Sequence, residues 1–123
     1  MQLVVDCYRI CDELPRNEEF GLKQQIRRAA VSVPANIAEG HGRSSTGEYL
    51  QHLGVAHGSL LEVETHSQIA GRLGYLKDAR VHQTLEQTSE IGRRLNALIG
   101  RLRLRRRTKT DNPAFIEVEF PGV

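Results

Sequence analysis

The chain has 123 residues, of which 39% are hydrophobic and 26% charged, so it is long enough for one globular domain and too short for two. Trp is absent and only three Phe and three Tyr are present, which favours packed helices over an aromatic-rich β-sandwich. The formal net charge of +2 is uneven, because residues 1–92 carry −3, residues 93–109 carry +8 and residues 110–123 carry −3.

The chain shows no secretory leader pattern and no apolar run near the roughly 18 residues that cross a bilayer. We therefore expect a cytoplasmic protein that does not insert into membranes. Cys7 and Cys11 are spaced i, i+4 and lack the C-x-x-C spacing of redox and zinc motifs, so both are expected to be reduced thiols in a helix core.

Apolar residues recur with a helical period in the first part of the chain. The pattern predicts a helix over about residues 2–14, which ends before Pro15. A second helix is expected over 18–40, capped by Asn17 and continuing through Pro34 with a bend. The glycines after Glu39 predict its C-terminal turn, where Gly tolerates a positive φ.

Two longer helices follow. Ser45 and Glu48 form an S-x-x-E capping box that opens a helix over 45–73, whose apolar side is expected to include Ile69 and Leu73. Gly54 and Gly58 share one face of this helix, which predicts close packing by a helix of this chain or of another subunit. The fourth helix is expected over 78–107. The prediction is an all-α protein, an antiparallel up-down four-helix bundle over 1–107.

The last segment breaks the helical pattern. Residues Phe115–Phe120 alternate apolar and polar side chains between Pro113 and Pro121, a period of two. A lone strand has no partner, so residues 108–123 are expected to be a non-helical C-terminal tail, either disordered or an extended arm that docks on another chain.

Residues 20–45, FGLKQQIRRAAVSVPANIAEGHGRSS, and residues 48–76, EYLQHLGVAHGSLLEVETHSQIAGRLGYL, carry a family resemblance. The chain resembles the bacterial four-helix-bundle family of 23S rRNA intervening sequence proteins. This resemblance implies antiparallel bundles that assemble into homopentamers. A related branch includes the accessory variability determinant of diversity-generating retroelements, which works with a reverse transcriptase and its template RNA.

No catalytic, metal or cofactor site is predicted. The E-x-x-H motif of di-iron bundles is absent, and the i, i+4 pairs of Glu with His at 48/52 and 62/66 are better explained as solvated surface pairs. Neither cysteine has an activating partner, and no serine lies in a G-x-S-x-G elbow, so an enzyme is not expected.

Four polar residues of the family-like segments are predicted to form a partly buried network that fixes bundle register or a subunit contact. They are Arg28, Asn36, Glu39 and Glu64. A ligand or nucleic-acid role for them is the alternative.

The basic end of the fourth helix is the strongest signal for a partner. The dipole of a helix favours a few cations at its C-terminus, but it does not require eight. Arg94, Arg101 and Arg105 are spaced i, i+7, i+11 and share one face. The predicted nucleic-acid-binding residues are Arg93, Arg94, Arg101, Arg103, Arg105, Arg106, Arg107 and Lys109.

The guanidinium fork suits bidentate contacts to phosphate, so the sequence predicts a non-enzymatic homo-oligomer, expected to be a pentamer, that binds nucleic acid, with RNA favoured. The alternative is a structural or protein-interaction module, such as a reverse transcriptase accessory protein, whose arginines serve subunit assembly.

Overall fold

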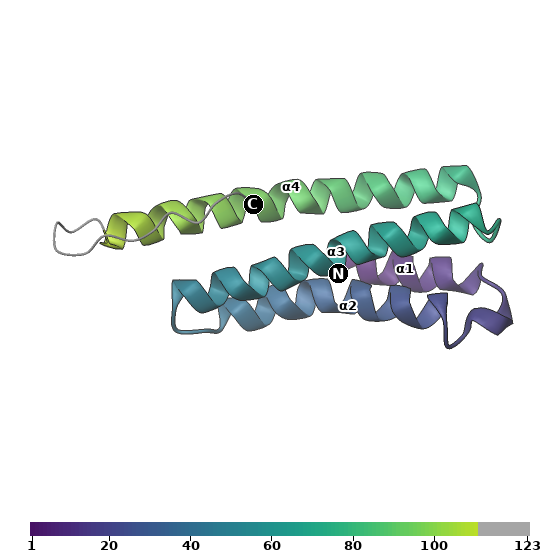
Figure 1. Cartoon of the computed structure of the whole chain (residues 1–123), viewed down its shortest axis with the longest axis horizontal. Coiled ribbons are helices and arrows are strands. Elements are labelled where there is room, and N and C mark those ends of the chain that lie inside the picture. Colours follow the sequence, from purple (N-terminus) through teal and green to yellow (C-terminus); the bar gives the residue numbers. More distant parts are fainter. Residues whose placement is uncertain (111–123) are drawn as a thin grey trace.

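The computed structural model describes residues 1–110, with side chains as far as Arg107. Four α-helices make up almost all of this part: α1 (Gln2–Asp12), α2 (Leu22–His41), α3 (Thr46–Arg72) and α4 (Asp78–Thr110), with a single 3-10 turn, η1 (Arg16–Glu18), between α1 and α2. Successive helices run in opposite directions (Figure 1). The predicted all-α, antiparallel up-down four-helix bundle is confirmed, and the described residues contain no strand.

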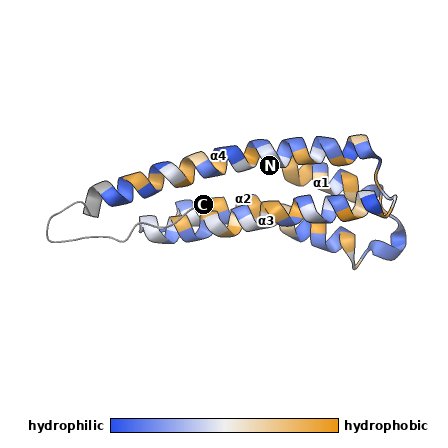
Figure 2. Ribbon diagram, turned by 45° about the horizontal axis from the view of Figure 1, so that its top comes forward, coloured by the Kyte–Doolittle hydropathy of each residue, from blue (hydrophilic) through white to orange (hydrophobic). Residues whose placement is uncertain are grey.

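The helices do not pack equally against one another. α3 packs along both α2 and α4, whereas α1 packs mainly on α2. Hydrophobic residues concentrate where α2 and α3 run together, and hydrophilic residues recur along α4 (Figure 2). The core is a continuous set of buried apolar side chains from all four helices, of which the largest with less than 2% exposure are Ile26, Leu53, Leu60 and Val63. No helix of the described part is long and apolar enough to cross a membrane.

The start of α2 differs from the prediction. The helix begins at Leu22 and not at residue 18, because residues 16–18 form the turn η1 and Asn17 does not cap a helix. The carboxylate of Glu18 takes the capping role instead: its Oε1 accepts the Leu22 backbone N–H at 3.1 Å. Its Oε2 accepts the hydroxyl of Tyr75 at 3.1 Å and so ties this turn to the α3–α4 connection.

The predicted start of α3 is confirmed. Ser45 is the N-cap, and its hydroxyl oxygen accepts the backbone N–H of Glu48 at 3.1 Å. α2 continues through Pro34 without ending. The predicted positive φ after Glu39 is wrong, since Gly74 at φ 80° is the one residue with a positive φ in the described part. Gly40 lies inside α2, and the backbone of Gly42 has a right-handed helical conformation.

α4 extends to Thr110, three residues beyond the predicted end. The predicted non-helical tail therefore begins no earlier than residue 111, and the predictions about residues 111–123 fall outside the described residues.

Candidate nucleic-acid interface

The second half of α4 carries a run of cations without an intervening acid. After Glu90, no Asp or Glu occurs before the end of the helix. Seven of the eight predicted binding residues have described side chains, and five of these are exposed: Arg93, Arg94, Arg101, Arg105 and Arg107. The structure therefore places most of the predicted guanidinium groups on the solvent side of one helix.

The first two arginines share one acid. Arg93 Nη2 donates to Glu90 Oε2, and Arg94 Nε donates to Glu90 Oε1 at 3.3 Å. The hydrogen bond from Arg93, with its charge and that of Arg94, lowers the pKa of Glu90. Glu90 therefore stays ionised and partly offsets the charge of this pair.

Arg101 and Arg105 are different. Both are exposed, and neither has an acidic partner among residues 1–107. With a rise of 1.5 Å per residue, Arg94, Arg101 and Arg105 lie about 10 Å and 6 Å apart along the helix axis. The three guanidinium groups border one side of α4, and those of Arg101 and Arg105 are free to reach an external anion.

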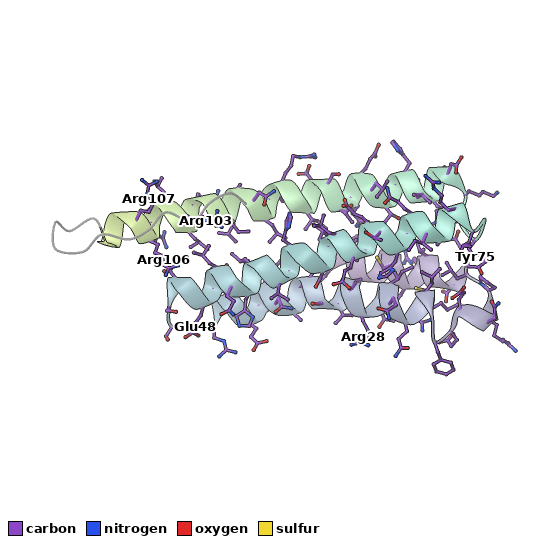
Figure 3. All side chains as sticks on the ribbon, in the orientation of Figure 1. Arg28, Glu48, Tyr75, Arg103, Arg106 and Arg107 are labelled. Carbon is purple, nitrogen blue, oxygen red and sulfur yellow. The ribbon has the colours of Figure 1, made fainter. Side chains whose placement is uncertain are left out.

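Arg103 and Arg106 turn toward the bundle. Both are partly buried, and Figure 3 shows them extending from α4 toward the start of α3, whereas Arg107 points away from it. The Nη2 atom of Arg106 lies 3.5 Å from the position that a Cβ on Gly47 would occupy. The Arg106 guanidinium therefore lies beside Gly47 in the first turn of α3. Lys109 lies in the last turn of α4, beyond the described side chains.

The four residues of the predicted polar network do not come together. Arg28 is exposed and points away from the bundle in Figure 3. Glu39 pairs with Arg43 on the surface of α2, with an N–O distance of 2.6 Å. Glu64 accepts the hydroxyl of the fully buried Thr88, at 2.6 Å, in the α3–α4 contact. Within one chain the four residues do not form this network, because Ile26, Ala29 and Ala30 occupy the inward side of α2, which turns Arg28 outward. Their role in a subunit contact stays a prediction.

Asn36 belongs to another network that joins α2 to α3. Its Nδ2 donates to the Ser32 carbonyl oxygen at 2.9 Å and to the Ser32 hydroxyl at 3.0 Å, and its Oδ1 lies 3.2 Å from His52 Nδ1. The Ser59 hydroxyl donates to that of Ser32 at 2.8 Å. The sequence does carry a signal for this network, since Ser32 and Asn36 are spaced i, i+4 and His52 and Ser59 are spaced i, i+7, as expected for two facing helices.

The family is decided by comparison with known proteins. Residues 1–97 match the family model described as 23S rRNA-intervening sequence protein. The chain belongs to this family. A crystal structure of a protein of unknown function from the S23 ribosomal protein family of Bacteroides thetaiotaomicron has the same fold, with a TM-score of 0.69 and 24% identity, covering 78% of this chain and 87% of that one. No curated protein matches the chain.

The 23S rRNA-intervening sequence family match ends inside α4. It includes Arg93 and Arg94 but stops before Arg101, so most of the basic residues lie beyond the part that the family model describes.

Metal binding and cysteine reactivity are the other chemistries that the residues of this chain could offer. Among residues 1–107, no three His, Cys, Asp or Glu side chains gather closely enough to hold a metal ion. Both thiols are fully buried, and burial is the main cause that raises the pKa of Cys7 to about 12. Cys7 is therefore a neutral thiol at physiological pH and a poor nucleophile.

Proposed function

We propose that this protein is a non-enzymatic, homo-oligomeric bundle that binds nucleic acid through the Arg-rich end of α4. We further propose that the nucleic acid it binds is RNA. The observation that carries the proposal is the pair Arg101 and Arg105, two exposed guanidinium groups on one side of a helix without an acidic partner among residues 1–107. Guanidinium groups make bidentate contacts to phosphate oxygens, and each phosphate neutralised releases counterions.

RNA is favoured over other polyanions because the family is described by an rRNA intervening sequence. The mode of binding follows from composition. With three Phe, three Tyr and no Trp in the chain, stacking on bases contributes little, so contacts to the phosphate backbone dominate. Binding is then tolerant of sequence and strongly dependent on salt.

Replacing Arg101 and Arg105 together with Ala tests the proposal. We expect the affinity for RNA at about 50 mM salt to fall about tenfold or more, and the slope of log affinity against log salt to flatten by about 1.5 to 2, because two phosphate contacts are lost. Fluorescence anisotropy with single-stranded RNA, duplex RNA and duplex DNA over a salt series measures both quantities.

The matched control is the double variant Arg16→Ala/Arg72→Ala. It removes the same charge from two exposed arginines at the opposite end of the bundle and should leave RNA affinity within about twofold of the parent. Equal losses in the two double variants, or no binding of the parent protein at about 50 mM salt, would exclude α4 as an RNA interface. A change of oligomer mass in the α4 variant would favour the alternative that these arginines serve assembly.

The homo-oligomeric part of the proposal rests on the outer face of α3. A Cβ built on Gly54 or Gly58 meets nothing within 4 Å, so no helix of the described chain packs there. Val55 and Leu61 beside them are 48% and 49% exposed. Two glycines inside a helix cost about 1 kcal/mol each relative to Ala, and packing by another subunit against this face would offset that cost.

Replacing Gly54 and Gly58 with Ala distinguishes an assembled protein from a monomer. We expect the parent to have a mass about five times 13.8 kDa by light scattering, and the double variant to dissociate because its methyl groups hold the partner subunit away. If the face is free, the same variant should instead gain about 2 kcal/mol of unfolding free energy with no change of mass. Gly100→Ala, at another open helical glycine, is the control that should leave the mass unchanged.

A further inference from the structure

α1 covers only one half of the bundle. With 11 residues it is about 16 Å long, whereas the 20 residues of α2 extend for about 30 Å. The Cys11 Sγ atom lies 3.6 Å from the carbonyl oxygen of Lys23, which places the end of α1 beside the start of α2. Figure 1 accordingly shows α1 beside the half of α2 nearest η1. Along the last two turns of α2, the described bundle consists of α2, α3 and α4 alone.

Apolar side chains from all three helices lie at this end. Ile37 of α2, Leu50 of α3 and Leu98 of α4 are partly buried and pack against the core. We call these three residues the open-end face. Leu98 shares its side of α4 with Arg101 and Arg105, at steps of three and four residues, so exposed guanidinium groups border the open-end face.

The chain itself supplies a segment whose chemistry matches this face. α4 ends at Thr110 at the same end of the bundle, and thirteen residues follow. Within them Ile116, Val118 and Phe120 alternate with Glu117 and Glu119, so an extended chain would place apolar side chains on one side and carboxylates on the other. At about 3.3 Å per residue, thirteen residues reach about 43 Å, more than the length of the uncovered part of α2.

We propose that residues Phe115–Phe120 dock on the open-end face of their own chain, with Ile116, Val118 and Phe120 against its apolar side chains. Glu117 and Glu119 then lie on the outer side of the segment, where the long side chains of Arg101 and Arg105 at the border of the face can reach them. The short tether favours the segment's own chain over a second copy, because it holds the segment at a millimolar effective concentration. As a consequence that rests on the proposed function, the segment competes with RNA for two of the binding arginines.

A disulfide cross-link tests the docking without RNA. In the full-length variant Leu98→Cys/Val118→Cys we expect mild oxidation to cross-link most of the protein within one chain, which denaturing electrophoresis without reductant detects. Cys7 and Cys11 are both buried and should not react. The control Ala97→Cys/Val118→Cys places the thiol one residue away, on an exposed side of α4, and should cross-link far less. Equal cross-linking of the two variants, or cross-linking between chains, would overturn the proposal.

RNA affinity tests the competition. In the full-length protein Glu117→Gln/Glu119→Gln should tighten RNA binding about fivefold, as expected when two exposed ion pairs no longer oppose it. Glu39→Gln/Glu48→Gln removes the same charge from exposed acids at the same end of the bundle and should have a smaller effect. Equal tightening in both variants would overturn the competition. Absence of RNA binding in every variant would instead refute the proposed function, and the cross-link would still decide the docking.

Discussion

Replacing Leu60 with Ala is expected to lower the free energy of unfolding by about 3–5 kcal/mol. Leu60 is 2% exposed, and its Cδ2 atom lies 3.6 Å from the position of a Cβ on Gly92, where α3 and α4 come together. Truncation removes buried methyl groups and leaves a cavity that the surrounding helices fill only in part. Urea denaturation of the two proteins measures the difference.

Leu73→Ala is the control for this loss. Leu73 is 54% exposed at the end of α3, and its replacement should cost less than about 1 kcal/mol. A similar loss in both variants would mean that the α3–α4 contact is not the packed core that the structure describes.

The bundle itself follows from helical periodicity, but the precise inward face of α3 does not. Its buried positions Ala56, Leu60, Val63, Ser67 and Ala70 repeat in steps of four and three. This spacing carries Ser67 into the core at 0% exposure. Hydrophobicity alone assigned Ile69 and Leu73 to the same face, yet they are 41% and 54% exposed. Which side chains of α3 face the core is determined by how the helices pack. The hydrophobic pattern of the sequence does not show this, so it places neither the buried Ser67 nor the exposed Ile69 and Leu73 correctly.

The candidate site could likewise be predicted only in part from the sequence. The placement of Arg101 and Arg105 on one exposed side of α4 could be predicted, because it depends only on the helical repeat within one element. The polar network could not, because it depends on which side chains two helices bring together. Asn36 takes part in a polar network, but its partner across the helices is His52 of α3 and none of the three predicted residues, and that contact is set by how closely α2 approaches α3.

Gly40 sets that approach. A Cβ at this position would lie 2.7 Å from His52 Cβ and 2.9 Å from Tyr49 Cδ1, closer than carbon atoms can pack. The glycine is therefore required for helix contact and not for a positive φ, because Gly40 lies inside α2 and its own φ is not positive. A side chain at Gly40 must push apart the last turn of α2 and the first turns of α3.

Gly40→Leu is accordingly expected to lower the free energy of unfolding by about 3 kcal/mol, the upper end of the range for overpacking, and to lengthen the contact between Asn36 and His52. Urea denaturation measures the first effect, and the His52 ring signals in NMR spectra report the second. Gly42→Leu is the matched control, because a Cβ on Gly42 stays 3.6 Å or more from its neighbours, and it should change stability by less than about 0.5 kcal/mol. Equal stability of the two variants would show that α2 and α3 are not in close contact at Gly40. Another contact between the two helices would then have to bring Asn36 close to His52.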